Sequence, residues 1–423
     1  MTLRSRRVRW SATVLSVSLV LTACVTPTDN SQKAQPVISA LPRALSGDEQ
    51  VAATATTEFG LALFRSVNAR TARDSSLTLS PVSASLALAL LLNGAEGETF
   101  DQVRRTLGFG DRALAPINAA YKSLIPLLTT LDPSVKMTFA NAAWFSLSSP
   151  PSAAYSERVA DTFAAKVATL SFGAPATVTT INTWASDATN ARIPKIVDRF
   201  NGDEIAFLAN ATYFKGKWRS QFAPSDTRPS AFRVTAAQTV QVPTMSSATG
   251  LIRIGTLPDG TQVGELPYGG DAFVMDIVLP PLGRIESTID SLTPTRWRSM
   301  LATLPDSMTS TLVQLPKFRL EVSRVLNEDL IALGMPRPFA SAQLVPMFAS
   351  PMRNLAVSTV LQKVFVDVNE EGTEAAAVTS ITIELTSAGP RGFVVDRPFL
   401  FVIRDRLTGT ILFMGKVLRP MAP

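Results

Sequence analysis

Residues 373–386 alternate between two kinds of side chain with a period of two. One side carries small residues first and large apolar ones later, while the other side is mostly polar, which is the pattern of a half-buried strand. The first side consists of Thr373, Ala375, Ala377, Thr379, Ile381, Ile383 and Leu385. The alternation follows Gly372 and ends in Ser387, Ala388, Gly389 and Pro390, a composition typical of an exposed loop. The pattern predicts a segment that can exist both as a loop and as a strand.

A second pattern predicts a buried helix early in the chain. Residues 81–93 are apolar on nearly every side, which is typical of a helix at the centre of a protein. Ser80 is suited to cap its N-terminus, Pro81 to its first position and Gly94 to the residue after its last turn. Apolar residues at a spacing of four predict another helix at Phe59, Leu63 and Val67.

Several apolar runs predict strands. They lie at residues 137–145, 264–280 (two strands with a turn at Gly269 and Gly270), 315–335 (a strand followed by a helix) and 355–372, which leads into the alternating segment. No internal repeat appears, and no linker interrupts the chain after residue 47. Although 423 residues would allow two or three domains, we expect one.

Composition excludes most enzyme classes. The chain has no histidine and one cysteine, Cys24. It therefore cannot form a Ser/His/Asp or Cys/His catalytic set, and it lacks the His and Cys ligands of the usual zinc sites. An internal disulfide is also impossible. The GxSxG and SxxK motifs are also missing, which leaves carboxylate-only hydrolysis as the conceivable enzymatic reaction. We therefore expect no catalytic residues, no metal and no cofactor.

The N-terminus predicts export. Residues 1–23 contain four arginines and then an apolar run that is too short for a confident membrane span. Residues 21–24, Leu-Thr-Ala-Cys, resemble the cleavage box of bacterial lipoproteins, which implies lipidation of Cys24 and anchoring at the bacterial cell envelope, facing the periplasm or the exterior. The alternative is an ordinary signal peptide with an incidental cysteine. Residues 24–47, rich in Thr, Pro, Ser, Gln and Asn, predict a flexible tether ahead of a folded domain at residues 48–423.

Removal of residues 1–23 also changes the charge of the chain. The formal net charge is +6, and four arginines with no acid lie in the removed segment, so the mature chain carries about 6 − 4 = +2. This charge is too small to indicate a nucleic-acid partner, and no basic run with interleaved aromatics appears.

Three ordered motifs resemble one protein family. Residues 370–377, Glu-Glu-Gly-Thr-Glu-Ala-Ala-Ala, resemble the hinge of the reactive loop of serpins, and residues 393–403 and 412–420 resemble the C-terminal signature and closing strand of that family. The resemblance covers about residues 48–420. It implies the serpin fold, an α+β architecture with a large, mostly antiparallel central sheet, surrounding helices and an exposed reactive loop at about residues 370–390. Residues 181–197 resemble a serpin helix that leads into this sheet, and residues 206–218 resemble one of its central strands.

The resemblance also assigns residues to three regions. The hinge comprises Glu370, Glu371, Gly372, Thr373, Ala375 and Ala377. The breach, where the loop would enter the sheet, includes Trp218 and Lys317, with Lys317 expected to pair with Glu370. The shutter, near the centre of the sheet, comprises Ser80, Ser83, Asn210 and Gln362.

Each of these assignments has a plainer alternative. Trp218 could be ordinary core, Lys317 and Glu370 could be two solvated charges, and the two serines could only cap their own helix. The family normally has histidine where this chain has Gln362, which offers a donor and an acceptor to the other shutter residues but does not titrate near neutral pH.

The implied function is the covalent trapping of a serine protease by a monomeric inhibitor. The protease would cut the loop at Thr386–Ser387, or one residue later, and remain bound as an acyl ester while the freed strand joins the sheet. In the uncut chain an arginine at position 373 could stay in water, so we expect Thr373→Arg to fold and to be recognised by a protease nearly as the wild type is. The alternatives are a non-inhibitory serpin that acts as a surface binding or chaperone-like protein, which the small hinge residues argue against, and a hydrolase of unrelated fold.

Arg104 and Arg105 are the only adjacent basic residues on the helix that binds heparin in some relatives, so we do not expect activation by polyanions.

Lipidation of Cys24 gives the first prediction. A diacylglyceryl group inserts two acyl chains, which is enough for stable membrane anchoring. Metabolic labelling with a fatty acid should therefore mark the wild-type protein and leave Cys24→Ala unlabelled. Equal label on both proteins would rule out this anchor.

Overall fold

One six-stranded sheet carries the hinge. The computed structural model describes residues 1–2, 35–200, 203–373 and 392–420, and within residues 35–423 the chain forms one compact unit. The strand order of this sheet is β10-β11-β12-β4-β2-β3, and all neighbours are antiparallel except β2 and β3. Its strands are β2 (Val135–Ser146), β3 (Lys166–Leu170), β4 (Ala206–Lys217), β10 (Phe318–Val325), β11 (Leu361–Val368) and β12 (Gly372–Thr373).

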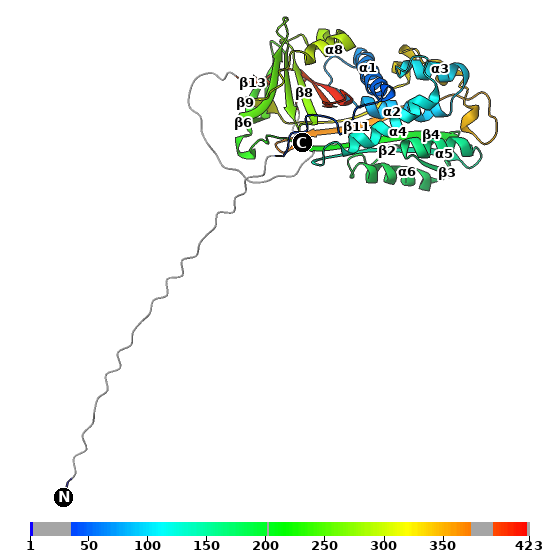
Figure 1. The fold of residues 1–423 in the computed structure, drawn as a ribbon, viewed down its shortest axis with the longest axis horizontal. Coiled ribbons are helices and arrows are strands. Elements are labelled where there is room, and N and C mark those ends of the chain that lie inside the picture. The colour runs from blue at the N-terminus through cyan, green and yellow to red at the C-terminus, as the bar shows by residue number, and fades with distance from the viewer. Residues whose placement is uncertain (3–34, 201–202, 374–391, 421–423) are drawn as a thin grey trace. The chain divides into compact units, whose positions relative to one another are not determined.

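A second, nine-stranded sheet packs beside the first (Figure 1). Its order is β1-β15-β14-β8-β7-β6-β9-β13, with β5 paired to β6. The bounds are β1 (Leu77–Leu79), β5 (Arg228–Arg233), β6 (Thr239–Thr256), β7 (Gln262–Pro267), β8 (Phe273–Leu279), β9 (Thr309–Pro316), β13 (Gly392–Val394), β14 (Phe399–Asp405) and β15 (Ile411–Val417). The family signature at residues 393–403 therefore forms β13 and β14, and residues 412–420 contain most of β15.

Helices cover both faces of the six-stranded sheet, as Figure 1 shows. On one face α2 packs against β4 and β2 in the main core, and on the other face α6 covers a second, separate core that includes Trp144, Ile181 and Ala209. The helices are α1 (Gly47–Ala69), α2 (Pro81–Asn93), α3 (Gly97–Thr106), α4 (Leu114–Thr130), α5 (Ala153–Phe163), α6 (Pro175–Ala188), α7 (Ile285–Asp290), α8 (Pro294–Leu301), α9 (Asn327–Ala332) and α10 (Arg337–Ala340), with short 3₁₀ turns at Pro224–Asp226 and Val345–Met347. No described helix is both long enough and apolar enough to cross a bilayer.

The cap residues of α2 act as the sequence predicts. The side chain of Ser80 accepts a hydrogen bond from the Ser83 N–H, Pro81 opens the helix and Gly94 follows its last residue. Nearly all side chains of α2 are buried, because the helix lies between the two sheets and has no solvent face.

The helix expected at residues 181–197 differs from the observed one. It starts earlier, at Pro175, and ends at Ala188. Asn190 and Ala191 adopt left-handed backbone angles (φ 53° and 62°), which a continuing helix does not allow. Residues 189–197, here called the cover segment, instead cross the surface of the sheet towards β11.

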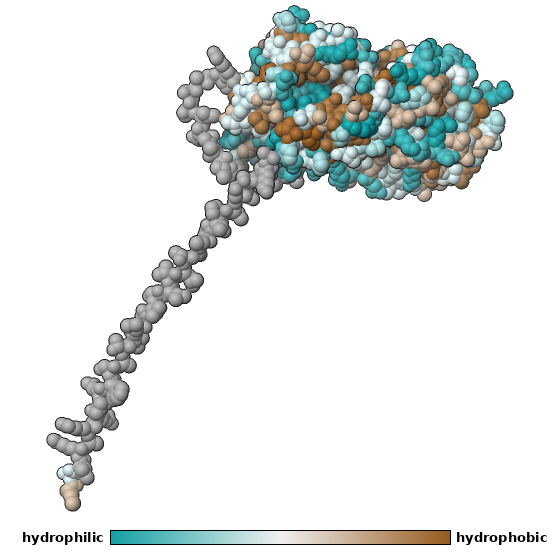
Figure 2. Space-filling model, in the orientation of Figure 1, coloured by the Kyte–Doolittle hydropathy of each residue, from teal (hydrophilic) through white to brown (hydrophobic). Residues whose placement is uncertain are grey.

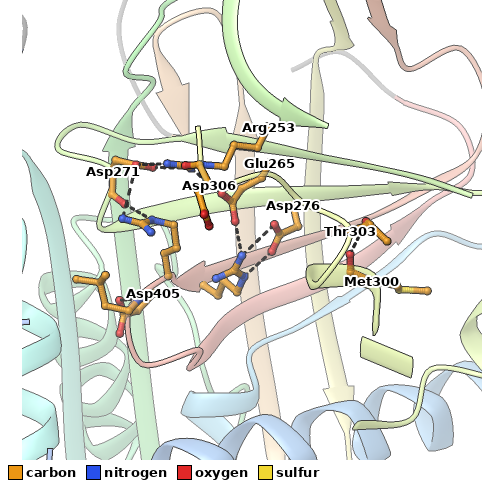
Figure 3. A network of polar contacts seen from close by, with 11 residues as sticks. Arg253, Glu265, Asp271, Asp276, Met300, Thr303, Asp306 and Asp405 are labelled. Carbon is orange, nitrogen blue, oxygen red and sulfur yellow. Dashed lines mark hydrogen bonds and ion pairs between the residues drawn. The ribbon is translucent and has the colours of Figure 1, made fainter. Parts of the chain in front are cut away.

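A buried network of charges joins four strands of the second sheet (Figure 3). Arg253 of β6 lies opposite Glu265 of β7, which lies opposite Asp276 of β8, and Arg404 of β14 bonds both carboxylates. Arg253 also donates to Asp271 at 3.0 Å. Asp271 ends the tight turn 268–271 of the β7–β8 hairpin, at the double glycine that the sequence predicts. Moving Asp271 away from Arg253 would leave a buried charge without its partner, which would destabilise the protein. The network therefore holds this turn in one position.

The start of the described chain contacts the same turn. The Ile38 N–H donates to the Gly270 carbonyl at 2.7 Å, and Arg406 donates to the Ile38 carbonyl at 3.1 Å. Ile38, Leu41 and Leu45 are partly buried against the main core. Part of the segment expected as tether, residues 24–47, therefore packs against the domain from Ile38 onwards.

Candidate functional site

The hinge already contributes a short strand to the sheet. Gly372 pairs with Lys217, and Thr373 pairs with Gly216 of β4 on one side and with Val368 of β11 on the other. In the described part of the chain, no strand pairing joins β4 and β11 directly. The two residues of β12 therefore occupy the top of a slot between these strands.

Thr373 is fixed in the slot by its side chain as well. It is 4% exposed, and its hydroxyl lies 2.6 Å from the hydroxyl of Tyr268, which is fully buried. Burial raises the pKa of Tyr268, so this hydroxyl stays protonated and can share its hydrogen with Thr373. Trp218 stacks on the Tyr268 ring with centroids 4.5 Å apart and planes at 11°. The expectation that an arginine at position 373 could stay in water in the uncut chain is wrong, because β12 buries this position before any cleavage.

Gly372 is required by close backbone contact. A Cβ atom at this position would lie 2.0 Å from the Gly216 carbonyl oxygen and 2.8 Å from the Lys217 Cα atom. Since those atoms belong to the backbone of β4, no side-chain movement would relieve the clash. Any other residue at position 372 would push β12 away from its neighbour.

The breach residues hold the turn that precedes β12. The Trp218 backbone N–H donates to the Glu371 carbonyl at 2.7 Å, and its indole N–H donates to the Asn369 carbonyl at 2.9 Å. Trp218 is thus buried in the core and also donates two hydrogen bonds to the hinge region.

Lys317 and Glu370 form the predicted pair, with Nζ and Oε2 3.0 Å apart. Their side chains are 22% and 12% exposed, so they are not two solvated surface charges. Burial would raise the pKa of Glu370, but hydrogen bonds from its own backbone N–H, Thr227 and Lys317 outweigh burial and hold that pKa below its usual value. The ion pair therefore persists to a lower pH than an ordinary glutamate would allow.

Three of the four predicted shutter residues are connected by hydrogen bonds, and the side chain of Asn210 bonds other residues. The Gln362 amide accepts from the Ser80 N–H at 3.1 Å and donates to the Ser80 carbonyl at 2.8 Å, while the Ser80 hydroxyl donates to the Leu412 carbonyl at 2.7 Å. Ser83 contributes its backbone N–H to the Ser80 hydroxyl. Asn210 turns elsewhere: it donates to Asn141 at 2.8 Å and accepts from Thr212 at 2.7 Å. Glutamine thus replaces the family's histidine by bonding both backbone groups of Ser80.

The cover segment closes the slot below Thr373. A cavity of about 10 Å³ lies there, lined by both strands and by the cover segment, which is roughly the space of one water. The Lys363 ammonium donates to the Lys195 carbonyl at 2.8 Å, and the Arg192 guanidinium lies 5.5 Å from the centre of the Phe365 ring. The segment is tied back to α6, because Asn182 accepts from the Ile196 N–H at 2.7 Å.

The remaining predicted residues lie outside the described ones. These are Cys24, Ala375, Ala377, Thr386 and Ser387. Sequence reasoning missed Tyr268, whose hydroxyl bonds that of Thr373, and Thr227, which donates to Glu370 at 2.8 Å. The position of Tyr268 at the end of a strand, just before Gly269 and Gly270, was the feature of the sequence that could have drawn attention to it.

Comparisons with known proteins agree with this geometry. The family model described as Serpin (serine protease inhibitor) matches residues 54–420. An uncharacterized serpin-like protein of Thermococcus kodakarensis is 33% identical over 88% of this chain and 87% of its own length, and neuroserpin of Gallus gallus is 34% identical over 82% and 87%. The solved structure of human thyroxine-binding globulin is 26% identical, has a TM-score of 0.79, and covers 88% of this chain and 100% of its own.

The chain therefore belongs to the serpin family. The predicted fold class is confirmed: a large sheet of mostly antiparallel strands with surrounding helices. The family is one of serine protease inhibitors, not of enzymes. It also includes proteins whose name describes ligand binding, such as thyroxine-binding globulin.

The contact between Tyr268 and Thr373 gives a prediction. Tyr268→Phe leaves the buried Thr373 hydroxyl without its partner, so the free energy of unfolding of the uncut protein should fall by about 1 to 3 kcal/mol. Thr373→Val should cost a similar amount because the Tyr268 hydroxyl is then unpaired. Denaturant titration of both single variants and the double variant measures the coupling. The double variant should be less destabilised than the sum of the two, and simple additivity would show that the hydrogen bond contributes nothing.

Proposed function

We propose that this protein inhibits serine proteases by covalent trapping, with insertion of its cut loop into the slot between β4 and β11. The observation that carries the proposal is β12: its two residues already pair with both strands, which are not paired with each other. A strand that continues from Thr373 would find backbone donors and acceptors on both sides. Insertion is therefore the extension of an existing ladder.

The register of β12 matches the side chains that would follow. Thr373 lies opposite Gly216 and Val368, so each further residue of the loop meets the preceding residue of β4 and of β11. Six residues on, Thr379 would come between Asn210 and Gln362. A hydroxyl can donate to one amide and accept from the other.

The chemistry of trapping is supplied by the protease. Its serine oxygen attacks the carbonyl carbon at the cut site, the peptide C–N bond breaks, and the amine leaves with a proton from the protease's histidine. The protease is then joined to this chain through an ester, which water would normally hydrolyse. Inhibition requires that insertion carries the ester away and distorts the protease before water attacks. This chain supplies the bond that is cut and the strand that inserts.

The second candidate function is binding without inhibition, as the name thyroxine-binding globulin implies for that relative. Insertion would then be blocked by bulky or charged residues in the hinge. Thr373, Ala375 and Ala377 are small, and β12 has already entered the sheet, which favours inhibition. We also propose that lipidated Cys24 holds the inhibitor at a bacterial cell envelope, since the Leu-Thr-Ala-Cys box precedes a polar tether.

Substitution of Thr373 by arginine tests the mechanism. The site is buried and faces Tyr268, so an arginine there must lose its water without a partner or leave the sheet, and either costs several kcal/mol. The loop remains available to a protease, but insertion becomes slower than hydrolysis of the ester. We expect Thr373→Arg to be cut by the protease that the wild type traps.

The assay is incubation with a panel of serine proteases followed by denaturing electrophoresis. Wild type should give an adduct that survives denaturation, Thr373→Ser should behave like wild type, and Thr373→Arg should give mainly cleaved product. Equal adduct from Thr373→Arg and wild type would contradict insertion from this residue. Cleavage of the wild type without adduct would favour the binding function.

The loop sequence predicts the class of protease. No Lys or Arg occurs between Thr373 and Pro390, and small residues surround the bond at Thr386–Ser387. Trypsin-like enzymes, whose pocket carries an acid for basic side chains, should be poor targets. Elastase-like or subtilisin-like enzymes, and chymotrypsin-like ones that act after Leu385, should be better. Mass spectrometry of the released C-terminal peptide locates the cut, and rapid trapping of trypsin would contradict this assignment.

A further inference from the structure

The buried charge network of the second sheet contains more carboxylates than guanidinium groups (Figure 3). The carboxylates are those of Glu265, Asp271, Asp276 and Asp405, and the guanidinium groups are those of Arg253, Arg404 and Arg406. Each of these carboxylates is at most 2% exposed, so water does not stabilise its charge. A buried carboxylate without a cation of its own takes up a proton instead. The network therefore favours binding of one proton.

Asp276 is the carboxyl best placed to hold this proton. It is fully buried in β8, and the Arg404 Nε atom donates to it at 2.7 Å. The same guanidinium group bonds Glu265, which lies opposite Asp276 on β7, so one cation serves two adjacent carboxyls. Burial raises the pKa of Asp276 to about 7; Arg404 opposes this rise and Glu265 adds to it. The segment after α8 contributes only a carbonyl, that of the exposed residue Asp306, to Arg253.

The other buried carboxylates have partners that stabilise their charge. Asp271 accepts from Arg253 at 3.0 Å and lies 3.6 Å from the guanidinium group of Arg406. Asp405 accepts two backbone N–H bonds and one hydroxyl bond from residues 407–408. Burial raises the pKa of Asp405, and these three donors oppose that rise. Asp276 has no such set of neutral donors among the described residues.

Arg253 connects the proton to the turn of the β7–β8 hairpin. Its Nη1 atom donates to Glu265 at 2.7 Å and to Asp271 at 3.0 Å, so the two carboxylates share this cation. When Asp276 loses its proton, its full charge attracts Arg404 more strongly, and Glu265 then depends more on Arg253. Arg253 is drawn away from Asp271, because the attraction between opposite charges is strong in a buried site.

We propose that Asp276 is the proton-binding site of a switch that sets how firmly the hinge is held. With the proton bound, Arg253 fixes the turn 268–271 and so places Tyr268 against Thr373 of the hinge. Without the proton, the turn and the hinge are held less firmly. The inference concerns the uncut protein and does not depend on the trapping of a protease.

The pH dependence of stability tests the proton. The chain has no histidine, and ordinary carboxyls titrate near pH 4, so no ordinary side chain changes its charge between about pH 5.5 and 7. A carboxyl whose pKa is higher in the folded than in the unfolded state binds its proton only when folded. Stability should therefore fall as the pH rises through this window and level off above about pH 7.

Denaturant titrations at several pH values measure this slope. Relative to Asp276→Asn, the unfolding equilibrium constant of the wild type should rise by up to about tenfold per pH unit, which corresponds to one proton. Glu286→Gln is the matched control, because it neutralises a partly buried carboxylate that pairs with Lys416 outside the network, and it should keep the wild-type slope. A wild type whose stability does not change between pH 5.5 and 7 would overturn the proposal.

Carbon-13 NMR of protein labelled at its aspartate carboxyls locates the proton. The resonance that Asp276→Asn removes should titrate at about pH 7 in the wild type. Titration of the Asp405 resonance in its place would overturn the assignment to Asp276.

Amide hydrogen exchange tests the connection to the hinge. The Trp218 N–H bonds the Glu371 carbonyl, so its protection, corrected for the intrinsic exchange rate, should fall several-fold from about pH 6 to about pH 8 in the wild type. In Asp276→Asn the protection should not change with pH. Constant protection in the wild type would show that the proton does not reach the hinge, and the switch would be overturned. The slope and the exchange of the wild type each decide the matter even if Asp276→Asn does not fold.

Discussion

A hydrogen bond between Thr373 and Tyr268, together with the backbone pairs of β12, keeps β4 and β11 apart at the top of the sheet. Its geometry depends on the turn 268–271, which the Arg253–Asp271 contact fixes from the second sheet and Ile38 fixes from the N-terminal segment. Trp218 joins the two parts, because it stacks on Tyr268 and donates to the carbonyl of Asn369. The hinge is therefore attached to buried side chains of both sheets, while β4 and β11 have no strand pairing with each other in the described part of the chain.

Below its top, the slot between β4 and β11 is closed by the cover segment and bordered by the shutter residues. Among the described residues, the cover segment contacts β11 through an ammonium–carbonyl hydrogen bond from Lys363 and through the Arg192–Phe365 contact. At the shutter, Gln362 secures β11 to Ser80, whereas the described partners of the Asn210 side chain are Asn141 on β2 and Thr212 on β4. Separating β4 from β11 at this level breaks no direct hydrogen bond between Asn210 and Gln362. Within the described residues, β12 thus joins β4 and β11 at the top of the sheet, and no strand pairing joins them further down.

Sequence reasoning succeeded where local chemistry decides structure. Ser80, Pro81 and Gly94 delimit α2 because caps depend on residues next to each other in the chain, and the apolar run at residues 137–145 gave β2 for a similar reason. By contrast, β4 and β15 came from the family resemblance. The Lys317–Glu370 pair came from the family resemblance, and no spacing in the chain would have indicated it. The residues that were missed act over long separations: Tyr268 meets Thr373, which is 105 positions further on. Burial of Thr373 could not be foreseen because a threonine between Gly and Glu is equally compatible with loop and strand. The end of α6 was misplaced because Asn190 and Ala191 leave the helix without a glycine or proline at that point.

Amide hydrogen exchange before and after the loop is cut tests the central claim most directly. If the cut strand extends β12, backbone amides of β4 and β11 that face the slot gain hydrogen-bond partners, so their exchange should slow strongly after cleavage. Amides in the parallel pair β2–β3, at the far edge of the same sheet, should exchange at unchanged rates. Unchanged exchange in β4 and β11 after complete cleavage would show that the strand does not enter the sheet, and the account of this protein as a trap would be contradicted.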